Sequence, residues 1–172
     1  MVEFALVLPI MLILLFGILD LARVYTTMMG VESAAREAAD YGTTLGAGKW
    51  QDGLPQAGTE AAMRHRACVA TRNLTDYTDS DTDPSNGCTN PAFSYCMTSS
   101  VGGTCAPFDA AAGCENPTRT PPCTVTVTLT YQFRLLAPLG IDFFGVRLGF
   151  PSDFTLQRDS TFAITDIDVA GP

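Results

Sequence analysis

The chain has 172 residues, about the length of one ordinary globular domain. Charged residues make up 16% of it, against roughly 25% in a typical soluble domain, and the formal net charge is −8. This acidic balance excludes the basic surface that a nucleic-acid-binding protein needs. A single histidine and a single lysine give little support to acid–base, triad or zinc chemistry, so we expect neither an enzyme nor a resident cofactor.

An uncharged apolar run covers residues 4–19, with Glu3 before it, Asp20 at its end and Arg23 one turn later. With its flanks the run is just long enough to cross a bilayer, which takes about 20 apolar residues. It lacks the basic start and the small-residue cleavage site of a secretory signal. We therefore predict that residues 1–25 form a transmembrane or filament-core segment.

The helix is expected to continue beyond this run as an amphipathic segment over residues 26–42. Apolar residues recur there at spacings of three and four, and Gly42 is a plausible C-cap. A helix of about 40 residues would be about 60 Å long at about 1.5 Å per residue. Pro9 lies inside it and predicts a kink or local unwinding. The apolar positions of the continuation are Leu21, Val24, Met28, Val31, Ala35, Ala38 and Ala39.

Six cysteines, an even number, point to a disulfide framework in an oxidising compartment. The last five recur at intervals of eight or nine residues, and no pair forms a CxxC motif that would favour zinc. Six cysteines allow 15 pairings, and their spacing does not select one. They are Cys68, Cys88, Cys96, Cys105, Cys114 and Cys123.

Between the two ends, a second helix is predicted from Thr59, as N-cap, to about Leu74. Cys68 would tie this helix to the region 76–123, which is expected to consist of disulfide-stapled surface loops. Asn73 begins a glycosylation sequon, a weak signal.

Three aspartates alternate in the segment 76–87, at Asp79, Asp81 and Asp83. Their spacing resembles part of a calcium loop, but the glycine and glutamate that an EF-hand requires are missing. An EF-hand is therefore rejected. A solvated acidic loop and a looser extracellular calcium site stay open as alternatives.

The C-terminal part, 124–168, is predicted to form a small antiparallel sheet. Apolar and polar residues alternate strictly over 124–134, and a second strand is expected over 154–167, where Arg158 and Ser160 predict a bulge or an exposed mid-strand. The apolar connection between them is broken by glycines and prolines. We expect it to pack on the amphipathic part of the long helix, with Phe143 and Phe144 as inter-subunit contacts. The predicted fold class is α+β, with 26–172 as an extracytoplasmic head.

The N-terminal stretch VEFALVLPIMLILLFGILDLARVY, followed by ESAAREAADYG, resembles the TadE-like family. These proteins are pseudopilins and minor pilins of the tight-adherence branch of type IV pilus systems. VTVTLTYQFRLLAPLG and STFAI also resemble the C-terminal half of that family. The resemblance covers roughly residues 1–45 and 124–168.

This resemblance implies a leader removed by a prepilin peptidase and a membrane helix that later enters a filament core. Type IV pilins carry a glutamate at mature position five, and Glu3 is the corresponding carboxylate here. The resemblance implies that the Glu3 carboxylate pairs with the N-terminal amine of an adjacent subunit. Alternatively, Glu3 is a solvated residue in the first turn of the helix, where the helix dipole favours a negative charge. Because Glu3 is third here and not fifth, we expect either that two residues precede it in the mature chain or that the processing site differs from that of type IV pilins. Pro9, Asp20 and Arg23 complete the candidate assembly residues.

Three functions stay open at this point. The leading one is a structural pilin-like subunit that moves from the inner membrane into an extracellular filament for surface attachment. The second is a minor pseudopilin retained in the membrane that primes or modulates pilus assembly. The third is a membrane-anchored binding domain. The expected partners are other copies of the chain, the membrane, the pilus assembly machinery and the prepilin peptidase.

Overall fold

A computed structural model provides the structure. It describes residues 2–44, 46–50, 54–80, 87–99, 104–106, 113–114, 116, 120–135, 140–143, 146–149 and 153–165. The helices are α1 (Val2–Thr43), η1 (Ala47–Trp50, a 3-10 turn) and α2 (Leu54–Thr71). The strands are β1 (Thr78–Asp79), β2 (Cys88–Asn90), β3 (Ala92–Thr98), β4 (Thr124–Arg134), β5 (Gly140–Phe143), β6 (Val146–Gly149) and β7 (Asp153–Ala163). The predicted α+β class, with a long N-terminal helix on an antiparallel sheet, is confirmed.

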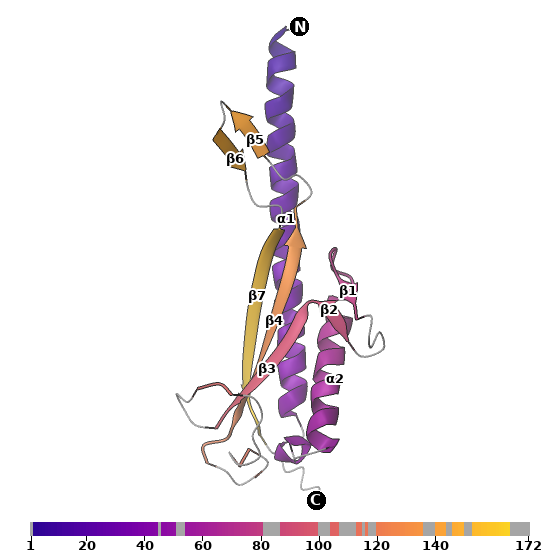
Figure 1. The fold of residues 1–172 in the computed structure, drawn as a ribbon, viewed down its shortest axis with the longest axis vertical. Helices are drawn as coiled ribbons and strands as arrows, with labels where there is room; N and C mark the ends of the chain where they lie inside the picture. The colour runs from indigo at the N-terminus through magenta and orange to yellow at the C-terminus, as the bar shows by residue number, and fades with distance from the viewer. Residues whose placement is uncertain are drawn as a thin grey trace, which may run out of the picture.

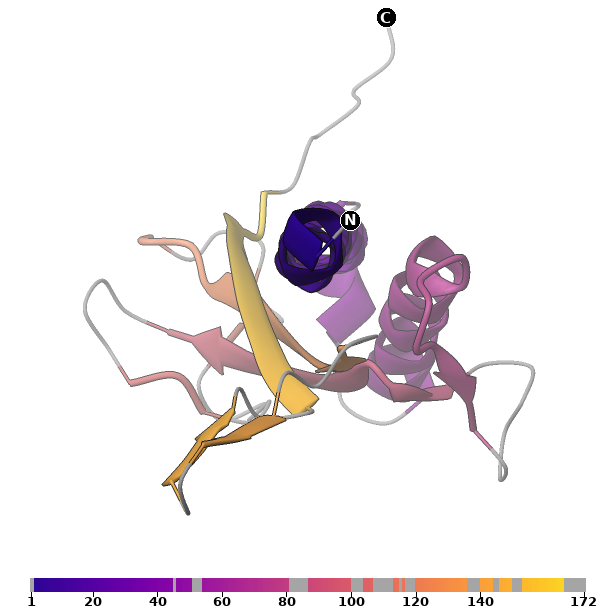
Figure 2. The ribbon, with the colours of Figure 1, turned by 90° about the horizontal axis from the view of Figure 1, so that it is seen from above.

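The main sheet has the order β3-β4-β7 and is antiparallel throughout (Figure 1). Both helices lie on one face of it: α1 contacts β4 and β7, whereas α2 reaches β3. Figure 2, viewed from above, shows the sheet curving around α1. The strictly alternating pattern of β4 explains this layering, because its apolar residues turn toward the helices and become fully buried while its threonines face outward. The buried residues are Val125, Val127, Leu129, Tyr131 and Phe133.

The helix continues through Pro9 without interruption and ends one residue past the predicted Gly42. Gly42 is therefore not the C-cap, because it lies in the last turn. It is needed there for close packing, since a Cβ would meet Met63 Sδ at 2.8 Å. Small residues dominate the packed side of α1, where Ala34, Ala35, Ala38 and Ala39 are fully buried. Leu21, predicted for this face, is 70% exposed.

The second helix begins earlier than predicted. Thr59 is not its N-cap, because α2 starts at Leu54 and Thr59 lies in its interior. The Thr59 hydroxyl instead donates to the Lys49 carbonyl at 2.9 Å and ties α2 to η1. The indole of Trp50 donates to the Gly42 carbonyl at 2.8 Å. Trp50 thus joins η1 to the end of α1 at the end of the head far from the N-terminus (Figure 1).

The region 76–123 is not composed of loops alone. Ala92–Thr98 is the edge strand of the main sheet and pairs residue by residue with β4. Phe93, Tyr95 and Met97 alternate in the sequence with Ser94, Cys96 and Thr98, a strand signal that the prediction of loops overlooked. The second C-terminal strand pairs with β4 over eleven consecutive positions, so the predicted bulge near Arg158 is wrong.

Three disulfides join the six cysteines as Cys68–Cys88, Cys96–Cys105 and Cys114–Cys123. The predicted framework is confirmed, and Cys68 does connect α2 to the region that follows it. The first bridge spans 20 residues of sequence and the other two span nine each.

The longest bridge is expected to contribute the most stability. A chain-entropy argument assigns about 3 kcal/mol to a 20-residue loop and about 2.5 kcal/mol to a nine-residue loop. We expect Cys68→Ala with Cys88→Ala to lower the free energy of unfolding more than Cys96→Ala with Cys105→Ala. Urea unfolding followed by Trp50 fluorescence measures both. The reverse ranking would contradict this assignment.

Candidate assembly surface and head–helix junction

The apolar half of α1, defined as residues 4–19, is exposed on all sides wherever its side chains are described. Every described side chain from Val7 to Leu19 is exposed, and Phe4 reaches 71%. Consecutive exposed positions leave no buried stripe, unlike the one-sided pattern of a helix on the surface of a globular protein. This segment projects beyond the head at the N-terminal end of the molecule (Figure 1). Such a surface is stable only in lipid or against other apolar helices.

Among the described residues, α1 is the one helix that is long and apolar enough to cross a membrane, judged by length and composition. The candidate span begins at Val7. Sixteen apolar residues cover about 24 Å at about 1.5 Å per residue, slightly less than a hydrocarbon core of about 30 Å. The apolar half therefore fits a bilayer with its ends close to the two interfaces.

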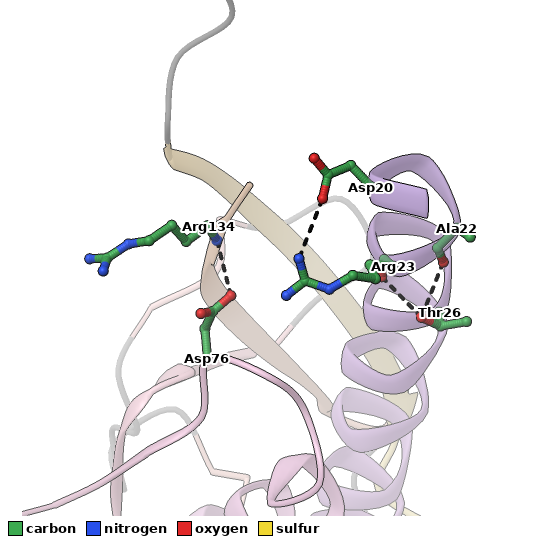
Figure 3. Close-up of polar contacts among 6 residues, drawn as sticks. All are labelled: Asp20, Ala22, Arg23, Thr26, Asp76 and Arg134. Atoms are coloured by element: carbon green, nitrogen blue, oxygen red, sulfur yellow. Dashed lines mark hydrogen bonds and ion pairs between the residues drawn. The ribbon is translucent and has the colours of Figure 1, made fainter. Parts of the chain in front are cut away.

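Burial changes abruptly at Asp20, which is only 7% exposed. Its carboxylate forms an ion pair with Arg23 at 3.4 Å, and the Arg23 guanidinium lies 5.1 Å from the centre of the Phe133 ring on β4. Figure 3 shows Arg23 extending from α1 and reaching Asp20 at the top of the head. These three residues form the junction, where the head begins to cover α1.

The candidate residues Asp20 and Arg23 are thus brought together, with Phe133 as a partner that the sequence did not indicate. Pro9 is exposed in the apolar half, eleven residues before Asp20. Glu3 lies in the first turn of α1, but its side chain is outside the described part, as is the whole of Phe144. Phe143 is the last residue of β5. The pairing role of Glu3 and the inter-subunit role of the two phenylalanines stay predictions.

A polar groove of about 430 Å³ lies below the junction, beside the ends of β4 and β2. Side chains complete the pairing of β4 there, beyond the last residue that β3 can pair. The Asn90 amide accepts from the Gln132 N–H at 2.8 Å and donates to the Gln132 carbonyl at 2.8 Å. The Asp76 carboxylate accepts from the Arg134 N–H at 3.0 Å (Figure 3). Two side chains therefore satisfy an exposed strand edge that would otherwise be open to pairing.

The sequence offers no signal for these capping residues. Asn90 and Asp76 are ordinary turn formers, and their partners lie about 40 or more residues away along the chain. The groove is lined by Asp76, Tyr77, Thr78, Thr89, Asn90, Ala92, Thr130, Gln132, Phe133, Arg134 and Asp153.

The candidate calcium residues are only partly described. Asp79 lies in β1, and its carboxylate accepts from the Tyr77 hydroxyl at 2.6 Å. Asp81 and Asp83 lie outside the described residues. Within the described ranges no cluster of three or more histidine, cysteine or acidic side chains could hold a metal ion. Calcium binding stays a prediction. Asn73 is exposed in the turn after α2, as a glycan acceptor must be.

Cations gather on one ring at the far end of the head. Lys49 lies 3.7 Å from the centre of the Tyr41 ring, and the Arg66 guanidinium lies 4.4 Å from it. The Lys49 ammonium also donates to the Tyr41 carbonyl at 2.9 Å. Burial and the neighbouring Arg66 lower the pKa of Lys49. These contacts join α1, η1 and α2 into one unit.

Three tyrosines titrate above their ordinary range. Burial, aided by the hydrogen bond to Asp79 and by its charge, raises the pKa of Tyr77 to about 12. Burial also raises the pKa of Tyr95, which donates to Glu60 at 3.3 Å. Burial likewise raises the pKa of Tyr131, whose oxygen accepts from the Asp76 N–H at 3.0 Å. The fold therefore favours the protonated phenols.

We expect the head to lose stability in alkali. A raised pKa contributes stability fully below the unfolded value of about 10, and this contribution is lost as the pH rises through the folded value. For Tyr77 the window runs from about pH 10 to about 12. The contribution of Tyr77 to the free energy of unfolding should be level below this window and fall within it. Urea titrations at several pH values measure the slope, and Tyr77→Phe should reduce it. An unchanged slope in that variant would contradict the assignment to Tyr77.

Residues 1–40 match the family model of the TadE-like proteins. The N-terminal part of this chain is therefore similar to the TadE-like proteins. No match was found among curated proteins or among solved structures. The family match covers the apolar half of α1, the junction residues on that helix and the start of its buried part. The TadE-like resemblance is thereby confirmed for the N-terminal block. For residues 124–168 it stays a prediction.

Proposed function

We propose that the chain is a structural, pilin-like subunit of a tight-adherence-type extracellular filament. Three observations support this proposal: the TadE-like match, the projecting apolar half of α1, and a head stapled by three disulfides. The first two observations fit a protein related to tight-adherence pili whose N-terminal helix is suited to membrane anchoring.

The single observation that carries the proposal is the exposure of the apolar half on every side. One helix crossing a membrane needs only lipid around it, and a bundle of identical helices replaces lipid with apolar neighbours of the same kind. Each large apolar side chain gains about 1.5–3 kcal/mol when it is fully removed from water. Removal of the apolar half from water therefore drives anchoring, and assembly keeps it out of water by exchanging lipid for the apolar helices of other subunits. No catalytic step is required.

In the proposed sequence of events, the chain waits in the inner membrane with its head outside the cytoplasm. The prepilin peptidase and the pilus assembly machinery then act on it, and its partners become other copies of the same chain in a helical homopolymer. Glu3 is proposed to enter the apolar core by pairing with the N-terminal amine of its neighbour, since an unpaired carboxylate is costly there. The outcome is attachment of cells to surfaces.

Shearing tests the filament proposal. Cells are sheared, filaments are pelleted at high speed without detergent, and the pellet is probed for this chain and imaged. Long filaments composed of the chain are expected. Scattered copies in filaments built from another subunit would favour the minor pseudopilin. A monomer recovered only with detergent would overturn assembly and favour a membrane-anchored binding domain.

Glu3→Leu tests the pairing within the same assay. We expect loss of filaments while the amount of chain in the membrane stays level, because the substitution removes the charge without shortening the apolar segment. Val2→Leu, next to it, is the matched control and should assemble. Normal filaments from Glu3→Leu would assign Glu3 to the wet first turn.

A further inference from the structure

The polar groove beside the ends of β4 and β2 takes no part in the proposed assembly. Its volume of about 430 Å³ lies within the range of about 300–1,000 Å³ that is typical of small-molecule sites. Thr130, Gln132 and Arg134 line it and alternate along β4 with buried residues that face the helices. Figure 3 shows the Arg134 side chain extending away from α1. The groove therefore opens on the outer side of the sheet, opposite both helices (Figure 2).

A peptide strand cannot pair with β4 in this groove, although open strand edges commonly accept one. The Asn90 amide already occupies the N–H and the carbonyl of Gln132, each at 2.8 Å. The Asp76 carboxylate already occupies the N–H of Arg134 at 3.0 Å. The backbone groups that an added strand would need are thus used within the fold. A ligand in the groove must be recognised by side chains.

Several lining side chains keep hydrogen-bonding capacity to spare. The side-chain amide of Gln132 and the hydroxyl of Thr130 have no hydrogen-bond partner among the described residues, and Gln132 is exposed. The Asp76 carboxylate uses one oxygen for the Arg134 N–H, which leaves the other for a ligand. Amides and carboxylates are planar and can each hold two neighbouring polar atoms. The groove can therefore make several directional hydrogen bonds at once.

The charge and polarity of the groove narrow the class of ligand. The carboxylates of Asp76 and Asp153 and the single guanidinium of Arg134 line it, so a phosphate, a sulfate or an acidic sugar would meet an excess of negative charge. Phe133 is 1% exposed, which leaves Ala92 and Tyr77 as the apolar surface among the described lining residues. These features favour a ligand that is uncharged and rich in hydroxyl groups.

We propose that the groove is a binding site for neutral oligosaccharides. Each hydroxyl of a sugar both donates and accepts, so two adjacent hydroxyls match the paired groups of the Gln132 amide and the Asp76 carboxylate. The Tyr77 hydroxyl is held by Asp79 at 2.6 Å, which fixes an aromatic ring at the groove for the apolar C–H face of a sugar. The site deepens the proposed function by naming what the head attaches to, and it rests on that function for the exposure of the head to the medium.

Saturation-transfer NMR tests the site in the full chain, held in a zwitterionic detergent because glycosidic detergents would compete. The probes are cellotetraose, N-acetylchitotetraose and mannotetraose, with trigalacturonate as the charged control. We expect saturation of at least one neutral probe and none of trigalacturonate. A tenfold rise in salt should change the Kd of the neutral probe by less than about twofold, since no ion pair holds it. No signal from any neutral probe, or a preference for trigalacturonate, would overturn the proposal.

Gln132→Ala locates the binding within the groove. We expect its affinity for the neutral probe to fall about tenfold, because two hydrogen bonds of ordinary strength are lost. The variant should keep the unfolding midpoint, since Asn90 bonds to the backbone of Gln132 and not to its side chain. Gln157→Ala, at an exposed position of β7 outside the groove, is the matched control and should stay within about twofold of the unmodified chain. Equal affinities of the two variants would overturn the groove assignment.

The shearing assay separates failure of this site from failure of the proposed function. Filaments that form from a chain without oligosaccharide binding would overturn the groove site alone. A chain that binds the probe through Gln132 but is recovered only as a detergent-soluble monomer would support the site and overturn assembly. Gln132→Ala should still form filaments, because the groove lies on the side of the sheet away from α1.

Discussion

Replacing Met11 by aspartate is expected to weaken membrane partitioning of the chain by roughly 100-fold. Met11 is 63% exposed near the middle of the apolar half, where nothing in the head can shield a charge. An aspartate at the centre of a membrane helix costs about 2.5–3.5 kcal/mol on insertion scales, and a factor of ten corresponds to about 1.4 kcal/mol. Binding to liposomes, followed by flotation, measures the change.

Met29→Asp is the matched control for that substitution. Met29 is 56% exposed on the same helix but lies within the head, below the junction. The same change of residue there should leave partitioning within about twofold of the unmodified chain, since a surface substitution shifts stability by about 0.5 kcal/mol or less. Both variants should keep the three disulfides and the unfolding midpoint of the head. Equal loss of membrane binding in the two variants would contradict the placement of the membrane boundary at Asp20.

Trp50→Ala is expected to lower the free energy of unfolding of the head by about 3–5 kcal/mol, a large part of the stability of a domain this size. Trp50 is fully buried, and its ring centre lies 5.6 Å from that of Tyr95 on β3. Its indole also satisfies the Gly42 carbonyl at the end of α1. Truncation opens a cavity between η1, α1 and β3 and leaves that carbonyl without its partner.

Two further variants separate the contributions at this site. Trp50→Phe keeps most of the buried volume but removes the N–H donor, so it should lose about 1–3 kcal/mol. Val69→Ala, at a position of α2 that is 53% exposed, should change stability by about 0.5 kcal/mol or less. Urea unfolding followed by circular dichroism suits all three, since two of them lack tryptophan. If Trp50→Ala lowered the free energy of unfolding no more than Val69→Ala does, the placement of Trp50 in the centre of the core would be contradicted.

Part of the fold follows from local pattern. The apolar half of α1 can be predicted from the sequence because no charge interrupts it. Strand β4 can be predicted because its apolar residues recur at every second position. The alanines after Asp20 predict the packed side of α1, since only small residues allow a close approach to a sheet and a second helix. Disulfide bonding follows from the number and setting of the cysteines.

Other features needed partners that are distant in the sequence. Ala92–Thr98 alternates in the sequence, but its place as the edge strand of the main sheet depends on a partner, β4, that begins 26 residues after it ends. Thr59 is a residue type that is common at N-caps, yet it lies inside the longer helix α2. Its hydroxyl donates a hydrogen bond to the Lys49 carbonyl. Asn90 and Asp76 complete the edge of β4 only because folding brings three separate segments to one place.

The distribution of charge along the sequence indicates that the two parts of this protein lie in different environments. A run without charge must lie in lipid or among other apolar helices, and the acidic, disulfide-bonded remainder must lie in water; this also explains the low overall charge. Tertiary structure alone decided where the two parts meet. Asp20 and Arg23 become a boundary because Phe133 and the end of β4 reach α1 there. The Cys68–Cys88 bridge, which joins α2 to β2, depends on the same kind of tertiary packing, whereas the other two bridges join cysteines nine residues apart.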